Sequence, residues 1–270
     1  SPWPFIALKL NLLAMPKTAL ITGSTSGIGL GIAHQFAKAG YNLVLNGLEP
    51  NGSSIAAEMA STYQIETQFS PANMLDAAAL RTMVAEAVAK FGSIEVLICN
   101  AGIQHVSPIA DFPEDKWDAI LSINLSAAFH LTKAVWPHMR AQGFGRIIHI
   151  ASAHGLMASE FKSAYVAAKH GLVGFTKVAA LEGAPHNITC NAICPGYVKT
   201  PLVEKQIADQ ARVHNLSEDE VVSKVMLLKQ AVKEFVPVET LGELALFLAS
   251  DGAKTLTGTA LPVDGGWYAQ

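Results

Sequence analysis

Short apolar runs alternate along the chain with longer segments in which apolar residues recur at helical spacing. The apolar runs predict strands at residues 18–22, 42–46, 66–69, 96–99, 146–150, 189–193 and 260–263. The longer segments predict helices at residues 28–39, 53–63, 77–91, 116–142, 163–182 and 239–249. Because apolar and polar positions barely alternate within the runs, we expect helices on both faces of the sheet. The pattern predicts a single α/β domain with a doubly wound parallel sheet of about seven strands.

Two segments depart from this rhythm. Residues 1–14 precede Met15 and are apolar, but they are too few to cross a bilayer. We interpret them as a leader that is vector-derived or disordered, and we assign residues 15–270 to the domain. Residues 197–237 are polar and lie between the last two predicted strands. In an α/β fold this position suits a lid over the carboxyl ends of the sheet.

Composition narrows the class of protein. Half of the residues are hydrophobic, 15% are charged and the net charge is −3, so no broad basic surface predicts nucleic-acid binding. No segment predicts membrane insertion. Cys99, Cys190 and Cys194 lie in or beside apolar runs and form no CxxC pair. We therefore expect buried free thiols, no metal site, and a location in the reducing cytoplasm.

A glycine-rich turn follows the first predicted strand and opens the first helix. Gly23 permits a tight turn, Gly27 lets a pyrophosphate approach the backbone, and Gly29 allows close packing of helix on strand. The unpaired N–H groups at the helix start would bind phosphate. Such a turn can also be purely structural, but between a strand and a helix it predicts the dinucleotide site of a Rossmann-type fold.

The end of the second predicted strand bears on the choice of dinucleotide. An acidic residue there would bind the ribose hydroxyls, whereas Arg or Lys would favour a 2′-phosphate. The segment from Leu45 to Glu49 contains no basic residue, and Glu49 would have to reach back to act as the acid. This exclusion favours NAD. The small residues from Asn100 to Gly102 would let the backbone approach the adenosine ribose, or they form an ordinary turn.

Ser152, Tyr165 and Lys169 are the candidate catalytic residues. Tyr165 and Lys169 are four residues apart and so share one face of the predicted helix. A free phenol titrates near pH ~10, and a nearby ammonium stabilises its anion. Tyr165 could then take a proton from an alcohol that Ser152 hydrogen-bonds, while hydride passes to a nicotinamide. Tyr and Lys at this spacing are also common on any amphipathic helix, so the pair alone identifies nothing.

The motifs in combination resemble the short-chain dehydrogenase/reductase family from Lys17 to the C-terminus. They are TGSTSGIG at 22–29, NAG at 100–102, Ser152, YVAAK at 165–169 and the turn Pro195-Gly196. The resemblance implies a homotetramer and a fourth catalytic residue, Asn124, which holds a water in a proton relay from Lys169. It implies that Lys169 also positions the ribose, and that the NAD-binding residues are Gly23, Thr25, Ser26, Gly27, Ile28, Gly29, Leu48, Asn73, Met74, Asn100, Ala101, Gly102, Tyr165, Lys169, Pro195, Gly196, Val198 and Thr200.

Two positions depart from the family pattern. Cys99 stands where the family usually has Asn, and Asn73 stands where it usually has Asp near the adenine. The amide oxygen of Asn73 can still accept a hydrogen bond from the adenine amino group. These departures concern cofactor affinity and leave the expected reaction unchanged.

The substrate pocket resembles that of the D-3-hydroxybutyrate dehydrogenases within this family, through SAHGL at 152–156, KSAYVAAKHG at 162–171 and GGW at 265–267. A small hydroxy acid presents a carboxylate, which needs a cation and hydrogen-bond donors. Lys162 would supply the charge, and Trp267 would pack against the methyl end. The predicted substrate-binding residues are Gln104, Ser152, His154, Lys162, Tyr165, Gln206 and Trp267.

Other interpretations of Lys162 and Trp267 are possible. Lys162 could be a solvated charge and Trp267 a core residue. The resemblance implies reversible oxidation of (R)-3-hydroxybutyrate to acetoacetate by NAD. The alternatives are a dehydrogenase of another small alcohol or 3-oxoacyl substrate, and a nucleotide-binding sensor that lacks catalysis.

Overall fold

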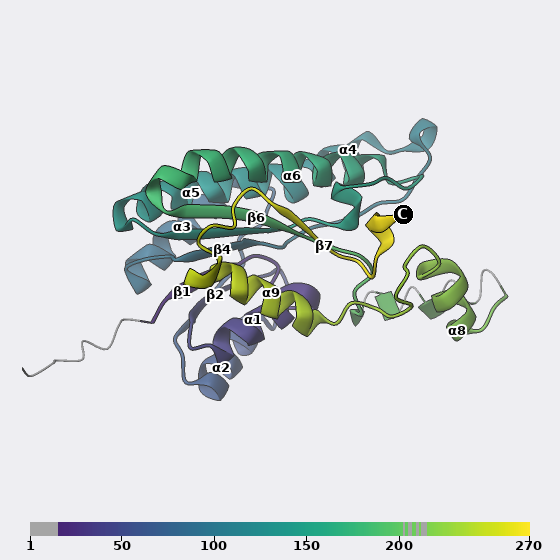
Figure 1. Cartoon of the computed structure of the whole chain (residues 1–270). Helices are drawn as coiled ribbons and strands as arrows, with labels where there is room; N and C mark the ends of the chain where they lie inside the picture. The colour runs from purple at the N-terminus through teal and green to yellow at the C-terminus, as the bar shows by residue number, and fades with distance from the viewer. Residues whose placement is uncertain (1–15, 202, 205–206, 209–210, 212–214) are drawn as a thin grey trace, which may run out of the picture.

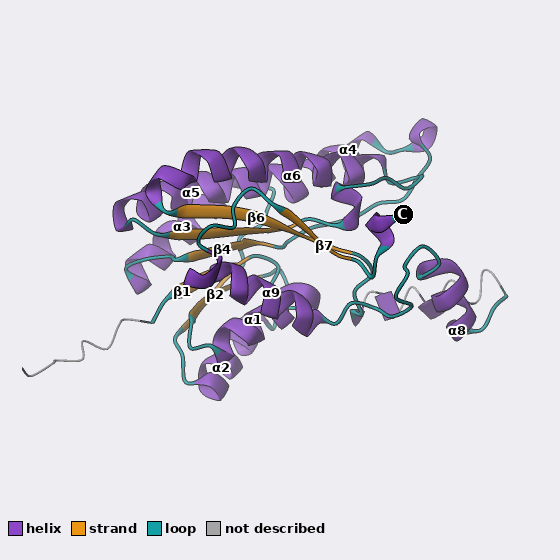
Figure 2. Ribbon diagram, viewed as in Figure 1, coloured by secondary structure: helices purple, strands orange, loops and turns teal. Residues whose placement is uncertain are grey.

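The strands form one parallel sheet, as predicted (Figures 1 and 2). The computed structural model describes residues 16–201, 203–204, 207–208, 211 and 215–270. Within these residues the strand order is β3-β2-β1-β4-β5-β6-β7. The strands are β1 (Thr18–Ile21), β2 (Asn42–Asn46), β3 (Thr67–Ser70), β4 (Val96–Cys99), β5 (Gly145–Ile150), β6 (Ile188–Pro195) and β7 (Ala260–Val263). The doubly wound α/β fold predicted from the sequence is confirmed.

Helices cover both faces of this sheet (Figure 1). On one face lie α1 (Gly27–Lys38), α2 (Gly52–Tyr63) and α9 (Val238–Ala249). On the other lie α3 (Ala77–Phe91), α5 (Ala127–Gln142) and α6 (Ser163–Gly183). The helix α4 (Glu114–Leu121) packs against α6, and the short helix α8 (Glu218–Val221) follows β6 in the chain.

The helix predicted at 116–142 is divided in the structure. It begins at Glu114, and a π-helical turn (Ser122–Ser126) separates α4 from α5. The extra residue in a π turn displaces the side chains that follow it, and such turns are frequent at functional sites. The turn carries Asn124, whose side chain is buried.

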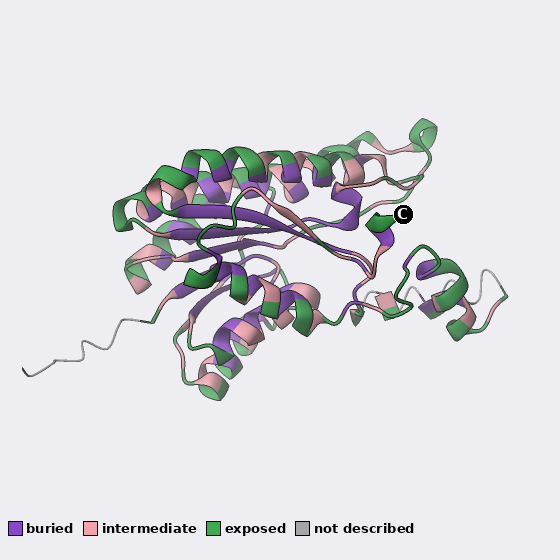
Figure 3. Ribbon diagram, in the orientation of Figure 1, coloured by how far each residue is buried: buried purple, intermediate pink, exposed green. Residues whose placement is uncertain are grey.

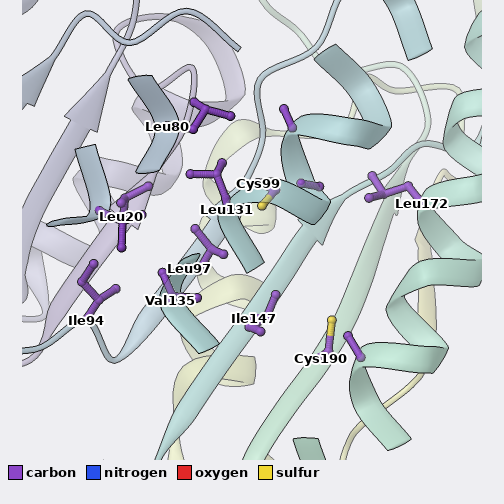
Figure 4. Packing of buried hydrophobic residues seen from close by; sticks show 14 of the residues in the cluster. Leu20, Leu80, Ile94, Leu97, Cys99, Leu131, Val135, Ile147, Leu172 and Cys190 are labelled. Carbon is purple, nitrogen blue, oxygen red and sulfur yellow. The ribbon is translucent and has the colours of Figure 1, made fainter. Parts of the chain in front are cut away.

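Two hydrophobic clusters form the core, one on each face of the sheet. Successive residues of a strand point to opposite faces, so Leu20 and Val44 join one cluster while Ile21 and Leu45 join the other. Figure 4 shows the first cluster, in which Cys99 and Cys190 pack among leucines, isoleucines and a valine. Cys99, Cys190 and Cys194 are buried and free, as predicted. Figure 3 shows the resulting pattern of buried strands beneath helices with exposed outer faces.

The sheet changes winding direction between β1 and β4, which are hydrogen-bonded neighbours. Connections leave this point toward opposite faces, so the carboxyl ends of the two strands leave a crevice between them. The glycine-rich turn follows β1 and Asn100 follows β4, so both predicted nucleotide segments lie at this switch point. A side chain at Gly29 is excluded there because its Cβ would lie 2.2 Å from the Gly23 carbonyl oxygen.

The two ends of the predicted lid segment are joined to each other. Val198 and Val236 form an isolated parallel bridge, so the two ends of the segment meet. Ser217 and Glu220 form a capping box that begins α8. In Figure 1, α8 and the C-terminal turn lie beyond the carboxyl end of β7. No helix in the described ranges is long and apolar enough to cross a membrane.

Candidate active site

Ser152, Tyr165 and Lys169 meet beyond the carboxyl end of β5. Ser152 follows that strand, and α6 turns Tyr165 and Lys169 toward it. The Lys169 ammonium lies 5.6 Å from the centre of the Tyr165 ring and donates to the Ile150 carbonyl oxygen at 2.8 Å. Lys169 is 4% exposed. The structure therefore brings together the three residues that the sequence predicted.

The charge environment of these residues differs from the sequence expectation. Burial raises the pKa of Tyr165, and the hydrogen bond from Ser152 opposes this in part. The expected lowering of the Tyr165 pKa by Lys169 is not seen, because desolvation of the phenolate dominates. Burial also lowers the pKa of Lys169 to about 8, which keeps its ammonium form at neutral pH. A positive charge is thus held against a protonated phenol.

Asn124 joins the π-helical turn to the loop after β4. Its side chain accepts from the Ile103 N–H at 2.8 Å and donates to the Ile103 carbonyl at 2.9 Å. Beside it lies a cavity of about 10 Å³, which Lys169, Thr22 and Cys99 also line. That volume is of the order needed for one water. The backbone of Ile103 therefore pairs with the Asn124 side chain, and the cavity lined by Asn124 and Lys169 has room for one water.

The loops at the nucleotide crevice are joined by hydrogen bonds. Asn100 donates through its side chain to the carbonyls of Thr22 and Gly23, each at 3.0 Å. The Thr22 hydroxyl accepts from the N–H groups of Asn100 and Ala101. Asn46 accepts from the Gly23 N–H and donates to the Ser70 carbonyl. Side chains and backbone thus hold the ends of β1 to β4 in one arrangement.

Small residues are required where the two turns approach each other. A Cβ at Gly23 would lie 3.0 Å from the Ala101 Cα, and one at Gly102 would lie 3.3 Å from the Asn124 Oδ1. Gly23 and Gly27 have φ of +59° and +53°, which favours glycine. Among the described residues, a Cβ at Gly27 would meet only the Thr200 methyl group, at 3.7 Å. The backbone at Gly27 therefore offers an open surface bordered by Thr200.

Glu49 does reach back to the glycine-rich turn. Its carboxylate accepts hydrogen bonds from the hydroxyl groups of Thr25 and of Ser26, the latter at 3.1 Å. The hydrogen bond from Thr25 is the main reason that the pKa of Glu49 is lowered. The second strand therefore supplies an acid to this crevice from three residues beyond its end.

The other predicted cofactor residues differ in how far their side chains are exposed. Leu48 is 67% exposed beside the crevice, and Asn73 accepts locally from the Leu75 N–H. The side chains of Met74 and Val198 belong to the two core clusters, so only their backbone could face a cofactor. Ile28 packs against the core at the start of α1, and Pro195-Gly196 lies at the end of β6.

His154 connects the catalytic residues to the aromatic end of the site. Its ring lies 6.0 Å from the Tyr165 ring and 5.3 Å from the Trp267 ring, both edge-on. The ring nitrogen Nε2 is hydrogen-bonded to the Ser159 hydroxyl at 2.9 Å, and the backbone N–H of His154 donates to the Ser152 hydroxyl. Burial, followed by the charge of Lys162, lowers the pKa of His154 to about 4, so the imidazole is neutral at pH 7. A neutral ring can donate from one nitrogen and accept at the other.

Trp267 is 7% exposed and stacks on Tyr197, with ring centres 5.9 Å apart and planes within 2°. Tyr197 was missed in the sequence, although its position directly after Pro195-Gly196 is a usable signal. Lys162 is half-buried at the N-terminus of α6, and burial is the main reason that its pKa is lowered. Gln104 is exposed in the loop after β4, and Gln206 lies outside the described residues.

Comparison with known proteins identifies the family. A model of the short chain dehydrogenase family matches residues 17–211, and the chain belongs to that family. It is 51% identical to D-beta-hydroxybutyrate dehydrogenase of Rhizobium meliloti over 95% of this chain and the whole of that protein. It is 49% identical to the protein of the same name from Cupriavidus necator, over 94% of this chain and 98% of that one.

A solved structure supports the same assignment. A variant of actinorhodin polyketide ketoreductase, crystallised with NADPH, superposes with a TM-score of 0.88 at 30% identity. The match covers 94% of this chain and 98% of that one. The family and this neighbour support a nicotinamide cofactor for the present chain.

Proposed function

We propose that this protein is an NAD-dependent dehydrogenase that reversibly oxidises (R)-3-hydroxybutyrate to acetoacetate. The observation that carries the proposal is one continuous site in which Ser152 and Tyr165 adjoin His154 and Trp267. The first pair suits proton transfer from an alcohol, and the second lies beside the half-buried cation Lys162. The similarity to two D-beta-hydroxybutyrate dehydrogenases supports this substrate.

Tyr165 is the general base in this proposal. The Ser152 hydroxyl hydrogen-bonds the substrate oxygen and so fixes the alcohol against the phenol. Because burial favours the neutral phenol, Tyr165 first gives up its own proton, and the nearby Lys169 ammonium stabilises the resulting phenolate. The phenolate then takes the proton of the alcohol, and a bound nicotinamide would accept the hydride. Loss of one proton and one hydride from the alcohol gives the ketone. During oxidation the proton would leave through Lys169 to a water held in the cavity beside Asn124.

The crevice at the end of β1 fits a dinucleotide. The backbone at Gly27 is open and in the left-handed conformation, at the N-terminus of a helix of 12 residues. Free N–H groups at a helix start bind phosphate. The proposed cofactor residues at this crevice include Thr25, Ser26 and the segment from Asn100 to Gly102.

Glu49 favours NAD over NADP. Its carboxylate lies on the hydroxyl groups of Thr25 and Ser26, where it could accept from ribose hydroxyls and would repel a 2′-phosphate. The solved relative with NADPH shows that the fold accepts the other cofactor, so the choice rests on this side chain.

His154, Lys162 and Trp267 select the acid. Lys162 binds the carboxylate, and the neutral His154 donates a hydrogen bond to it. The stacked rings of Trp267 and Tyr197 limit the size of the group that fits at the methyl end of the substrate. Gln104 and Gln206 are further proposed donors, and the segment 197–237 is proposed to act as a lid on the domain formed by residues 15–270.

A homotetramer in the cytoplasm completes the proposal. Exposed apolar side chains on α5 and α6, namely Phe129, Val178 and Leu181, suit burial between subunits. Three buried free thiols suit a reducing compartment. Sedimentation of the purified chain as a monomer would contradict the tetramer.

The substrate test is a panel of alcohols with the purified chain and NAD. We expect the highest kcat/KM with 3-hydroxybutyrate, and weaker activity with sugar alcohols and 3-hydroxyacyl thioesters. A higher kcat/KM for one of those classes would replace the proposed substrate while leaving the dehydrogenase reaction in place.

A further inference from the structure

Two lysines from distant parts of the chain act on His154. Lys162 precedes the first turn of α6, and Lys229 lies on the segment that follows α8. Both positive charges lower the pKa of His154, and Lys229 also lowers the pKa of Lys162. Such effects require the charges to be near one another. Lys229 has no role in the proton chemistry described above.

Neither lysine has an acidic partner in the described part of the chain. The ion pairs formed there involve Lys116, Lys199 and Lys224. Two neighbouring ammonium groups without a counter-ion repel each other, and a carboxylate between them removes that repulsion. The arrangement therefore favours occupation by an anion.

A cavity of about 390 Å³ lies beside Lys229. It is lined by Met157, Ala158, Lys229, Trp267, Tyr268 and Gln270. The Trp267 ring also packs at a right angle to the His154 ring, with centres 5.3 Å apart, and His154 is hydrogen-bonded to Ser152, so the cavity is linked through these rings to the catalytic residues.

The backbone at Lys229 is anchored while its side chain is exposed. The neighbouring Gln230 is 1% exposed, accepts from the Tyr197 N–H at 3.3 Å and donates to the Glu234 carbonyl at 3.0 Å. The Gln270 side chain donates to the Lys229 carbonyl. The position of the residue is thus fixed, and its ammonium can turn toward an anion in the cavity.

We propose that Lys229 is a second carboxylate-binding residue, which draws a hydroxy acid into the cavity beside Trp267 and shares its carboxylate with Lys162. The inference rests on the proposed function, since it assigns a determinant of substrate class to the same site. A neutral alcohol of the same size gains nothing from Lys229.

The test compares Lys229→Met and Lys229→Glu with the unaltered chain. Substrates are 3-hydroxybutyrate and butane-1,3-diol, in which a hydroxymethyl group replaces the carboxylate. Lys224→Met is the matched control, because it removes the same charge from a lysine that pairs with Glu220 at 2.8 Å. Initial rates are measured at low and high ionic strength.

We expect Lys229→Met to raise the KM for 3-hydroxybutyrate about five- to tenfold at low salt, with kcat within about twofold, since an exposed charge acts on encounter and binding. Lys229→Glu raises it further. The effect shrinks at high salt, and the KM for the diol stays constant. The inference is overturned if Lys229→Glu leaves the KM for the acid unchanged, or raises both KM values equally.

A binding measurement separates this inference from the proposed function. If the unaltered chain does not oxidise 3-hydroxybutyrate, the proposed substrate fails. Quenching of tryptophan fluorescence by acetoacetate still reports carboxylate binding beside Trp267. Weaker binding to Lys229→Met than to Lys224→Met then supports the second carboxylate-binding residue, and equal binding refutes it.

Discussion

The cofactor side and the substrate side of the site are built in different ways. On the cofactor side, the loops that follow β1 to β4 are joined by hydrogen bonds that the Asn100 side chain donates and that the side chains of Asn46 and Thr22 accept. On the substrate side, Trp267 is held by ring contacts with His154 and Tyr197, near Lys162 and Lys229, which form no ion pair with an acid among the residues that the structure describes. Ser152 and Tyr165 stand where the two sides meet.

This difference has a consequence for mutation. A directional network with buried partners loses several contacts when one member is removed. Ring packing is less directional and tolerates substitution with a graded loss. We therefore expect changes on the cofactor side to impair every substrate, and changes on the substrate side to alter which alcohol is oxidised.

Tyr165→Phe removes the phenol hydroxyl that lies between the cofactor side and the substrate side. We expect kcat to fall by about three orders of magnitude, because general base catalysis is lost. NAD affinity, measured by titration, should stay within about twofold, since the phenol oxygen alone is removed. A kcat within about tenfold of the unaltered chain would exclude Tyr165 as the base.

Asn100→Ala tests the hydrogen-bonded side. Loss of two bonds to backbone carbonyls is expected to lower the free energy of unfolding by about 1–3 kcal/mol and to raise the KM for NAD by about tenfold or more. Denaturant unfolding and initial rates measure the two effects. If only the KM for the alcohol changed, the division into two sides would be wrong.

Trp267→Ala tests the aromatic side. We expect kcat/KM for 3-hydroxybutyrate to fall about tenfold, since contact with the methyl end is lost. The KM for NAD should not change, and larger 3-hydroxy acids should become relatively better substrates. Equal losses for all chain lengths would show that Trp267 supports the fold and does not select the substrate.

Glu49→Gln tests the choice of cofactor with little change of shape. We expect the ratio of kcat/KM for NAD to that for NADP to fall about fivefold, because the charge that repels a 2′-phosphate is removed. Glu58→Gln, an acid on α2, serves as the control for net charge. An unchanged ratio would assign the preference to another residue.

The smallest effect concerns pH. Burial, aided by Lys229, lowers the pKa of Lys162, so its positive charge is lost at a lower pH than that of an ordinary lysine. The KM for 3-hydroxybutyrate should therefore rise severalfold as the medium becomes alkaline, while the KM for butane-1,3-diol should not. Lys229→Met should move the rise to higher pH. The same rise with the diol would contradict this origin.

Much of the fold could be predicted because the central strands are buried on both sides. Residues 42–46, 96–99 and 260–263 were predicted with their observed bounds, since turn residues or charges flank each apolar run. The π-helical turn at Asn124 could not be predicted, because helical periodicity continues through it and because Asn124 pairs with Ile103, which is distant in the sequence.

The site was predictable only where sequence order brings residues together. Tyr165 and Lys169 share a helix face, but the raised pKa of Tyr165 comes from burial by distant segments. The hydrogen bond from Thr25 to Glu49 could not be predicted from the sequence, because it depends on the path of the chain after β2. The role proposed for Lys229 could not be predicted from the sequence, because only the fold brings its charge near His154.

The most direct test of the account is NADH formation by the purified chain with (R)-3-hydroxybutyrate, (S)-3-hydroxybutyrate, and the (R) acid with NADP in place of NAD. We expect rapid NADH formation with the (R) acid, little with the (S) acid and little reduction of NADP. Preference for the (S) acid, or activity only with NADP, would contradict it.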